Sequence, residues 1–335
     1  MRKLSYFIIS IMTALLSSCD VHEWPESVEY VKLHLKLNYE TDITEWKHLY
    51  DGTSVIEQGV GKTYDNQQEY GEMRYIVRTY PVSGAQRATQ EHTQEFVHTK
   101  DVAEVGYSHS VTLDVLPGEY EVMIWSDLIE STGDDYFYNV DNFSEIILQG
   151  ETLNNSNHRD AFYSKNGITL HPDKLMQGQD TINITMRRSL AKFEIVATDL
   201  YDFVKKHGEN IDQYKVIVQY VGFISNAYSL FTNKPIDSAT GEMFKSSLKE
   251  LGEQEASLGF DYVFLSQQDS KVTIKIGVYK NDGTQVSMTK PIEVPLRLSH
   301  HTILRGNFLL QNTKASEGIN ISPGFDGNHN IVLKK

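Results

Sequence analysis

Cysteine is almost absent from this sequence, because Cys19 is the only one among 335 residues. A single thiol excludes a disulfide within the chain, so the fold must be held together by its hydrophobic core. Long apolar runs are missing as well. The run from Leu4 to Leu16 is too short to span a membrane. From the length of the chain we expect about two domains.

The first residues carry the features of a secretory signal. Arg2 and Lys3 precede the apolar run, and the small residues Ser17 and Ser18 stand directly before Cys19. Small residues followed at once by cysteine are typical of a lipoprotein signal, in which the thiol is acylated and becomes the mature N-terminus. We predict a signal peptide over residues 1–18 and lipidation of Cys19. An ordinary signal peptide with a chance cysteine is the alternative.

Positive charge is in the minority. The formal net charge is −14, and it becomes −16 when residues 1–18 leave with their two positive charges. So acidic a chain is not expected to bind nucleic acid or to adhere electrostatically to anionic lipid. Attachment to a lipid bilayer would therefore come from acylated Cys19, where each buried methylene contributes about 0.8 kcal/mol.

Alternation of apolar and polar residues predicts mostly strands. In Val31–Tyr39 every second residue is apolar, which is typical of a half-buried strand. Further strands are expected over Met73–Tyr80, His109–Leu116, Glu119–Trp125, Thr181–Met186, Tyr214–Phe223 and His301–Leu310. Residues 40–72 are rich in Gly, Asp, Thr and Gln, and we expect a loop there with a helical turn near Trp46.

Turn and cap residues predict a hairpin and two short helices. Lys271–Met288 reads as two strands joined at Asn281-Asp282-Gly283. Asp199 is expected to cap a helix that ends before Gly208, and a second short helix is expected over Met243–Leu251.

The predicted fold class is all-β, with two β-sandwich domains in tandem and a few short helices. The apolar pattern restarts after Met186, beyond a stretch rich in turn residues. We therefore expect an N-terminal domain over residues 19–186 and a C-terminal domain over residues 187–335.

No catalytic constellation stands out. Gly59-Val60-Gly61-Lys62-Thr63 resembles the end of a phosphate-binding loop, but Ile56 stands where that motif needs glycine. A strand would place His92 and His98 on one face and Glu95 on the other, so these three are not expected to bind a metal. A Gly-x-Ser-x-Gly nucleophile motif is missing. We expect no enzyme activity, no catalytic residue, no metal and no cofactor.

Aromatic residues leave a second function open. Trp24, Trp46, Trp125 and the 19 tyrosines could line a sugar site, although such residues more often fill sandwich cores. A surface lipoprotein that binds glycans is therefore an alternative.

Several short stretches, in order along the chain, resemble the fimbrillin-associated fimbrial anchor lipoproteins of the FimB/Mfa type. They are Cys19-Asp20-Val21-His22-Glu23-Trp24-Pro25, Val115–Tyr120 with Trp125-Ser126-Asp127, Arg159–Phe162, Arg188–Lys192, Ile303–Leu310 and Gly324–Asn328. They are spread over nearly the whole chain after the leader.

The resemblance implies two transthyretin-like β-sandwich domains and a lipid-anchored role in the outer membrane, at the cell surface and the base of a fimbrium. In that family, shaft subunits lose their first strand when an arginine-specific protease cuts the following loop, and a neighbour's strand then fills the groove. An anchor keeps its lipid and its first strand. An adhesive tip subunit of the same family is the remaining alternative.

Arginine distribution agrees with an anchor. The sequence has no arginine between Arg2 and Arg74, and Arg74 lies inside a predicted strand. Our hypothesis is that Val31–Tyr39 stays in its own groove and terminates growth, while the C-terminal domain joins a fimbrial shaft subunit by β-strand addition. Gly318–Lys335 is the candidate donor strand.

Overall fold

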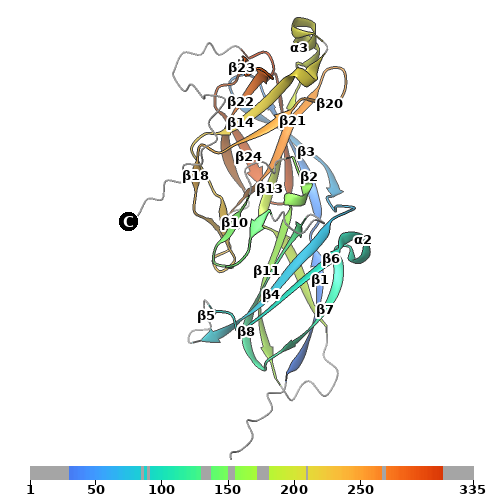
Figure 1. Cartoon of the computed structure of the whole chain (residues 1–335), viewed down its shortest axis with the longest axis vertical. Helices are drawn as coiled ribbons and strands as arrows, with labels where there is room; N and C mark the ends of the chain where they lie inside the picture. Colours follow the sequence, from blue (N-terminus) through green and yellow to red (C-terminus); the bar gives the residue numbers. More distant parts are fainter. Residues whose placement is uncertain are drawn as a thin grey trace, which may run out of the picture.

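The computed structural model describes residues 30–83, 87–88, 91–129, 137–149, 155–171, 181–208, 210–265 and 269–311. Within them the chain forms two β-sandwiches, stacked end to end along the long axis of the molecule (Figure 1). The α-helices of these residues are short: α2 (Val102–Val105) and α3 (Leu200–His207). The prediction of an all-β fold with tandem sandwiches is confirmed.

The first sandwich, the lower one in Figure 1, is one ladder in the order β5-β4-β8-β11-β12-β1-β7, with β6 on β4. Its strands are β1 (Val31–Tyr39), β4 (Glu72–Ser83), β5 (Arg87–Ala88), β6 (Gln94–Asp101), β7 (Ser108–Val115), β8 (Gly118–Ile129), β11 (Ala161–Leu170) and β12 (Ile182–Arg188). Side chains from both halves of the ladder meet in a single core. For example, the hydroxyl of Tyr39 on β1 donates to Oγ of Ser126 on β8 at 3.1 Å.

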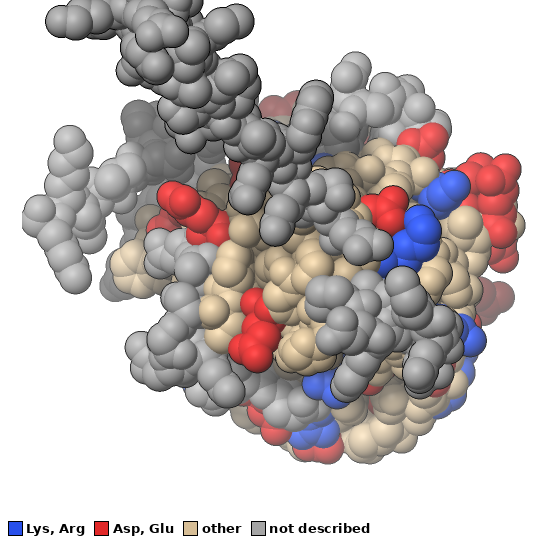
Figure 2. All heavy atoms as spheres, turned by 90° about the horizontal axis from the view of Figure 1, so that it is seen from below, with Lys and Arg blue, Asp and Glu red and all other residues tan. Residues whose placement is uncertain are grey.

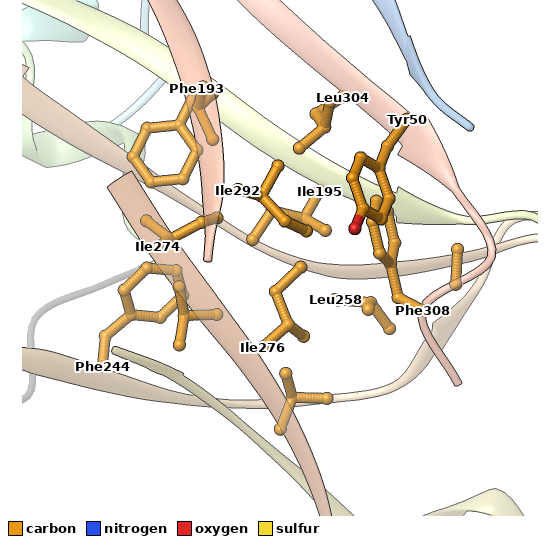
Figure 3. Close-up of a cluster of buried hydrophobic side chains, with 14 of the residues drawn as sticks. Tyr50, Phe193, Ile195, Phe244, Leu258, Ile274, Ile276, Ile292, Leu304 and Phe308 are labelled. Atoms are coloured by element: carbon orange, nitrogen blue, oxygen red, sulfur yellow. The ribbon is translucent and has the colours of Figure 1, made fainter. Parts of the chain in front are cut away.

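The second sandwich packs a six-stranded sheet, β20-β21-β13-β25-β2-β3, on the sheet β19-β14-β22-β23, with β24 on β22. Its strands are β2 (Asp42–Tyr50), β3 (Val55–Asp65), β13 (Leu190–Ala197), β14 (Tyr214–Tyr220), β19 (Met243–Ser247), β20 (Lys249–Glu250), β21 (Ala256–Phe264), β22 (Asp269–Lys280), β23 (Gln285–Met288), β24 (Ile292–Arg297) and β25 (His300–Gly306). Figure 3 shows the core between the sheets, where Phe193 and Leu304 of one sheet meet Ile276 of the other.

Two smaller sheets complete the described structure. One is four-stranded in the order β17-β16-β10-β9, and the other pairs β15 with β18. The strands are β9 (Tyr138–Asn139), β10 (Ile146–Leu148), β15 (Phe223–Ile224), β16 (Ala227–Ser229), β17 (Lys234–Ile236) and β18 (Ala239–Thr240). The four-stranded sheet joins segments of the chain that lie on either side of residue 186, because β10 pairs with β16.

Most of the predicted elements are confirmed. β1 alternates between buried and accessible residues along its whole length. The hairpin of β22 and β23 has its turn at residues 281–283. α3 begins after Asp199, and Gly208 ends it at a φ of +100°, which favours glycine.

The expectation of a loop over residues 40–72 is wrong, because β2 and β3 lie there and Trp46 is a strand residue. The ladder between β2 and β3 shifts register at Thr44/Trp46 and again at Lys47/His48. The extra residues at these shifts lie on β3 and break its period-two pattern. In β2 the polar His48 is buried and the apolar Leu49 is exposed, which hides the alternation. β2 pairs in parallel with β25. The domain expected over residues 19–186 therefore does not contain β2 and β3, which belong to the second sandwich.

The helix expected over Met243–Leu251 is also wrong, because β19 and β20 occupy this stretch. Phe244 and Leu248 are both buried and stand four residues apart, a spacing that imitates one face of a helix. The packing of Phe244 between the sheets of the second sandwich decides the outcome (Figure 3).

Charges of both signs are interspersed on the end of the first sandwich. Figure 2 views the molecule from below, and acidic and basic side chains there alternate with uncharged ones on the visible described surface. A cross-strand pair of this kind joins Lys32 and Asp114, whose Nζ and Oδ1 atoms are 3.0 Å apart. Such exposed pairs contribute little to stability.

Candidate functional site: the first strand and the seam between the sandwiches

β1 is an interior strand of the first sandwich. It pairs antiparallel with β7 from Val31 to Asn38 and parallel with β12 from Leu35 to Tyr39. Its inward side chains are at most 9% exposed: Val31, Leu33, Leu35, Leu37 and Tyr39. Full burial of one such aliphatic side chain contributes about 1.5–3 kcal/mol. β1 is thus held by a ladder on each edge and by the core on one face.

A link of two residues, Glu40 and Thr41, carries the chain from β1 into β2 and so from one sandwich to the other. The amide of Glu40 donates to the carbonyl of Met186 at 2.9 Å, and Thr41 is buried. Proteases cut exposed loop tips. A link of two residues whose backbone is hydrogen-bonded to β12 is no such loop tip and is therefore a poor substrate, although the side chain of Glu40 is exposed.

The side chain of Arg188, at the end of β12, holds this link. Nη1 donates to the carbonyl oxygens of Glu40 at 2.7 Å and Asp42 at 2.9 Å, and Nη2 donates to that of Thr41 at 2.7 Å. The other N–H groups face Asp160, whose oxygens lie 2.8 and 2.9 Å from Nε and 2.8 Å from Nη2. All five N–H donors of the guanidinium group are therefore satisfied. We call this arrangement the Arg188 clamp.

Asp160 extends the clamp into the second sandwich. Nδ2 of Asn66 donates to Oδ2 of Asp160 at 3.0 Å and to the hydroxyl of Tyr262 at 3.2 Å. Tyr262 donates to Oδ1 of Asn157, which also accepts from Nζ of Lys192 at 2.8 Å. Burial lowers the pKa of Lys192. A chain of hydrogen bonds thus joins the β1–β2 link to β13 and β21.

A second buried ion pair crosses the seam beside the clamp. Arg159 pairs with Asp261, and both side chains are almost fully buried. The hydroxyl of Tyr220 donates to Oδ2 of Asp261 at 2.6 Å, and the hydroxyl of Tyr138 donates to the carbonyl of Arg159 at 2.5 Å. Burial raises the pKa of Asp261, and the charge of Arg159 opposes that change.

An apolar cluster encloses these polar contacts. It takes residues from β4, β8, β10, β13, β16 and β21, so both sandwiches contribute to it. Its largest member, Trp125, is 0% exposed. We define the seam as this cluster together with the Arg188 clamp and the pair of Arg159 and Asp261. Two sandwiches that share a buried core and charged network are expected to move as one body.

The described tryptophans do not form a sugar platform. Trp125 lies inside the seam, and Trp46 is 6% exposed beneath the guanidinium of Arg297, whose Cζ is 4.0 Å from the ring centre. A sugar ring stacks only on an accessible aromatic face. The glycan-binding alternative therefore loses both residues, and Trp24 lies outside the described residues.

The other patterns singled out in the sequence are strand residues. Residues 59–63 lie in β3, so no phosphate-binding loop forms there. Glu95 pairs with Arg78, and the ring of His98 stacks on Tyr75 at 5.1 Å. Among the described residues, no group of three His, Cys, Asp or Glu is arranged to hold a metal.

Cys19 and the candidate donor strand, Gly318–Lys335, lie outside the described residues. In the part of the chain that the structure describes, no helix has the length and apolar character needed to cross a bilayer.

Asn66, Tyr262 and Asp261 are seam residues that the sequence did not single out. Asn66 stands among other polar residues, while Asp261 and Tyr262 stand in an apolar stretch, so no local pattern marks them as partners. The one available signal was the resemblance of Arg159–Phe162 and Arg188–Lys192 to stretches of a known family, and these two stretches meet at the seam.

We predict that Arg188→Ala lowers the free energy of unfolding by about 3–5 kcal/mol, because it leaves the buried Asp160 without its cation. Arg187→Ala is the matched control. Its side chain is 68% exposed, so a change within about 0.5 kcal/mol is expected. Urea unfolding followed by circular dichroism measures both. Equal effects of the two substitutions would contradict the clamp.

His109 on β7 gives the first sandwich a pH dependence. Its ring lies 5.8 Å from that of Tyr39 and 5.0 Å from that of Tyr75, and neither ring nitrogen has a hydrogen-bond partner among the described residues. Burial, assisted by the charge of Lys100, lowers the pKa of His109. The unfolded chain therefore binds a proton more readily than the folded one.

We expect the unfolding free energy to be greatest above the unfolded histidine pKa of about 6.5 and to fall as the pH drops below it. His109→Phe keeps a ring between the two tyrosines and should make this fall shallower. His34→Phe, on the accessible face of β1, is the control. Urea unfolding curves recorded between neutral and mildly acidic pH measure this dependence. If the unfolding free energy of His109→Phe changes with pH as steeply as that of the unchanged protein, His109 is not a source of the pH dependence.

Several solved structures of other proteins align with this chain. A candidate adhesin from Bacteroides ovatus aligns with a TM-score of 0.43 at 11% identity, over 81% of this chain and 80% of its own. The fimbrial anchor protein Mfa2 from Porphyromonas gingivalis aligns at 0.38 and 11%, over 77% and 82%. A fimbrial assembly protein from Parabacteroides distasonis aligns at 0.33 and 10%, over 82% and 92%.

Comparison of the sequence with family models identifies a family whose function is not assigned. A search of curated proteins gives no match. One family model covers residues 25–334, and so includes both sandwiches and the whole seam. The chain therefore belongs to the family described as a family of unknown function, DUF6562.

Proposed function

We propose that this chain is the lipid-anchored structural subunit at the base of a cell-surface fimbrium, which it attaches to the outer membrane and whose growth it terminates. The predicted lipidation of Cys19 and the resemblance of the quoted stretches to fimbrial anchor lipoproteins both support this. The observation that carries the proposal is the placement of β1, which is paired on both edges and clamped at its exit.

A subunit that accepts a neighbour's strand must first lose its own. Here β1 continues into β2 through only Glu40 and the buried Thr41, and Arg188 donates to the carbonyl groups of these two residues and of Asp42. Removing β1 would break its ladders with β7 and β12 and leave the guanidinium group buried without three of its acceptors. These contacts favour retention of the first strand, as an anchor requires.

The arginine distribution gives the same support. Arg74 is the first arginine after Arg2, and it lies in β4 with its guanidinium paired to Asp127 at 2.9 Å from Nε to Oδ1. Both side chains are buried. An arginine-specific protease therefore meets no accessible arginine between β1 and β4.

The seam suits a subunit under tension. A pull on lipidated Cys19 would enter the described structure at β1, along which the ladder bonds are loaded together in shear. From β1 the load would pass through the Arg188 clamp to β2 and β13, which lie on either side of β25. The fimbrial shaft subunit would be joined at the far end, through a strand donated by residues 318–335.

The first test is the N-terminus of the protein recovered from its native cells. We expect mass spectrometry to find Cys19 as the first residue, carrying acyl chains, with residues 31–39 still attached. Cys19→Ala should abolish the acyl mass and release the protein from membranes. A free thiol at position 19, or a chain that begins after residue 40, would contradict the proposal.

The second test concerns the donor strand. Deletion of residues 318–335 should detach fimbriae from cells while the truncated protein stays in the membrane fraction. Electron microscopy of cells and of the medium measures attachment. If fimbriae stay attached as firmly as in cells with the full chain, these residues are not the donor.

A further inference from the structure

Asp199 occupies the N-cap position of α3 but does not cap the helix. Aspartate is among the preferred residues there because its carboxylate accepts from the first amides of the helix. In this chain the side chain makes no such hydrogen bond. A good capping residue at a capping position is therefore used for something else.

The carboxylate binds the chain just beyond β25. Its oxygens accept from the backbone amides of Phe308 at 3.2 Å, Leu309 at 3.2 and 3.1 Å, and Leu310 at 3.0 Å. Three successive amides converging on one anion form a strong electrostatic site. Asp199 itself is 6% exposed, and burial raises the pKa of its carboxyl group.

Neighbouring contacts fix the same segment. The ring of Phe308 stacks on Tyr50 of β2 at 5.8 Å, as Figure 3 shows. Gly306 permits this approach, because a Cβ there would lie 2.9 Å from the ring of Phe308 and from the carbonyl oxygen of Tyr50. The hydroxyl of Ser287 on β23 donates to the carbonyl of Phe308 at 3.2 Å. Residues 306–310 are thus bound to β2, β23 and the start of α3.

The position of these contacts determines which bonds are loaded first when a force acts on the C-terminal end of the chain. β25 lies between β2 and β13 and runs parallel to both. A force applied beyond residue 311 reaches the bonds to Asp199 before it reaches the ladder of β25.

We propose that Asp199 is a positioning residue that fixes the base of the C-terminal segment, residues 312–335, on the second sandwich. A load applied beyond residue 311 is then shared by β13, α3 and β25. The partner is a protein with an open strand-accepting groove. This identification of the partner rests on the proposed function.

Amide hydrogen exchange on the full-length protein tests the role of Asp199. In Asp199→Ala we expect amides 308–310 to exchange at least about tenfold faster, because local opening no longer breaks bonds to a carboxylate. Amides of β13 serve as the internal reference for global stability. Asp202→Ala, which removes an exposed acid at the third residue of α3, is the control and should leave amides 308–310 unchanged.

The pattern of exchange separates positioning from helix capping. Positioning predicts faster exchange at 308–310 and unchanged exchange in the last turn of α3. Faster exchange confined to α3, or rates at 308–310 equal to those of Asp202→Ala, would overturn the proposal.

Retention of fimbriae on cells under flow tests whether Asp199 bears load. Cells carrying Asp199→Ala should lose fimbriae several-fold faster than cells carrying Asp202→Ala. If the two retain fimbriae equally while deletion of 318–335 detaches them, Asp199 bears no load, and the donor assignment stands. If the deletion itself leaves attachment intact, the donor assignment fails, and the exchange result alone decides whether Asp199 fixes residues 308–310.

Discussion

One buried guanidinium group ties the two sandwiches together. The guanidinium group of Arg188 has five N–H donors. Their acceptors are the carbonyl groups of the β1–β2 link and the carboxylate of Asp160, which come together only here. Buried ion pairs seldom add much net stability, because desolvation offsets their attraction. Their geometry is demanding, however, and a partly satisfied network is costly. The clamp therefore specifies one arrangement of link, β12 and η1 (Asn157–Arg159), and with it the position of one sandwich on the other.

This arrangement supports the retention of the first strand that we propose. β1 is not a separate edge strand but the first part of a continuous path that crosses the seam into β2. The apolar cluster around Trp125 and the second ion pair, Arg159 with Asp261, add buried contacts between the two sandwiches. Trp125, one of the aromatics that the sequence left open for a sugar site, is part of this cluster. The shared core and charged network favour motion of the two sandwiches as one body, which agrees with the anchor role we propose.

Elements that are specified by a short stretch of sequence were predicted correctly. The period of two in β1, the turn at Asn281-Asp282-Gly283 and the start of α3 at Asp199 were all found from short stretches. The strand β2 was missed because the polar His48 is buried while the apolar Leu49 is exposed. A helix was expected over Met243–Leu251 because the spacing of Phe244 and Leu248 imitates one face of a helix. Asp199 was placed correctly, but its partners at 308–310 are more than a hundred residues away and could not be inferred.

The seam could not be assembled from the sequence for the same reason. Arg188 and Asp160 stand in stretches that resemble a known family, yet nothing in either stretch says that they meet, or that Asn66 joins them. Contacts between residues so distant in sequence depend on the paths of β2 and β3, which the sequence did not reveal.

The central claim is that β1 opens only when the whole structure opens. Native-state hydrogen exchange at increasing denaturant measures the free energy of opening for each amide. The account predicts that the amides of Val31–Tyr39 exchange with the same opening free energy as those of β8 and β13. Amides of β1 that exchange through a separate opening of much lower free energy would contradict it.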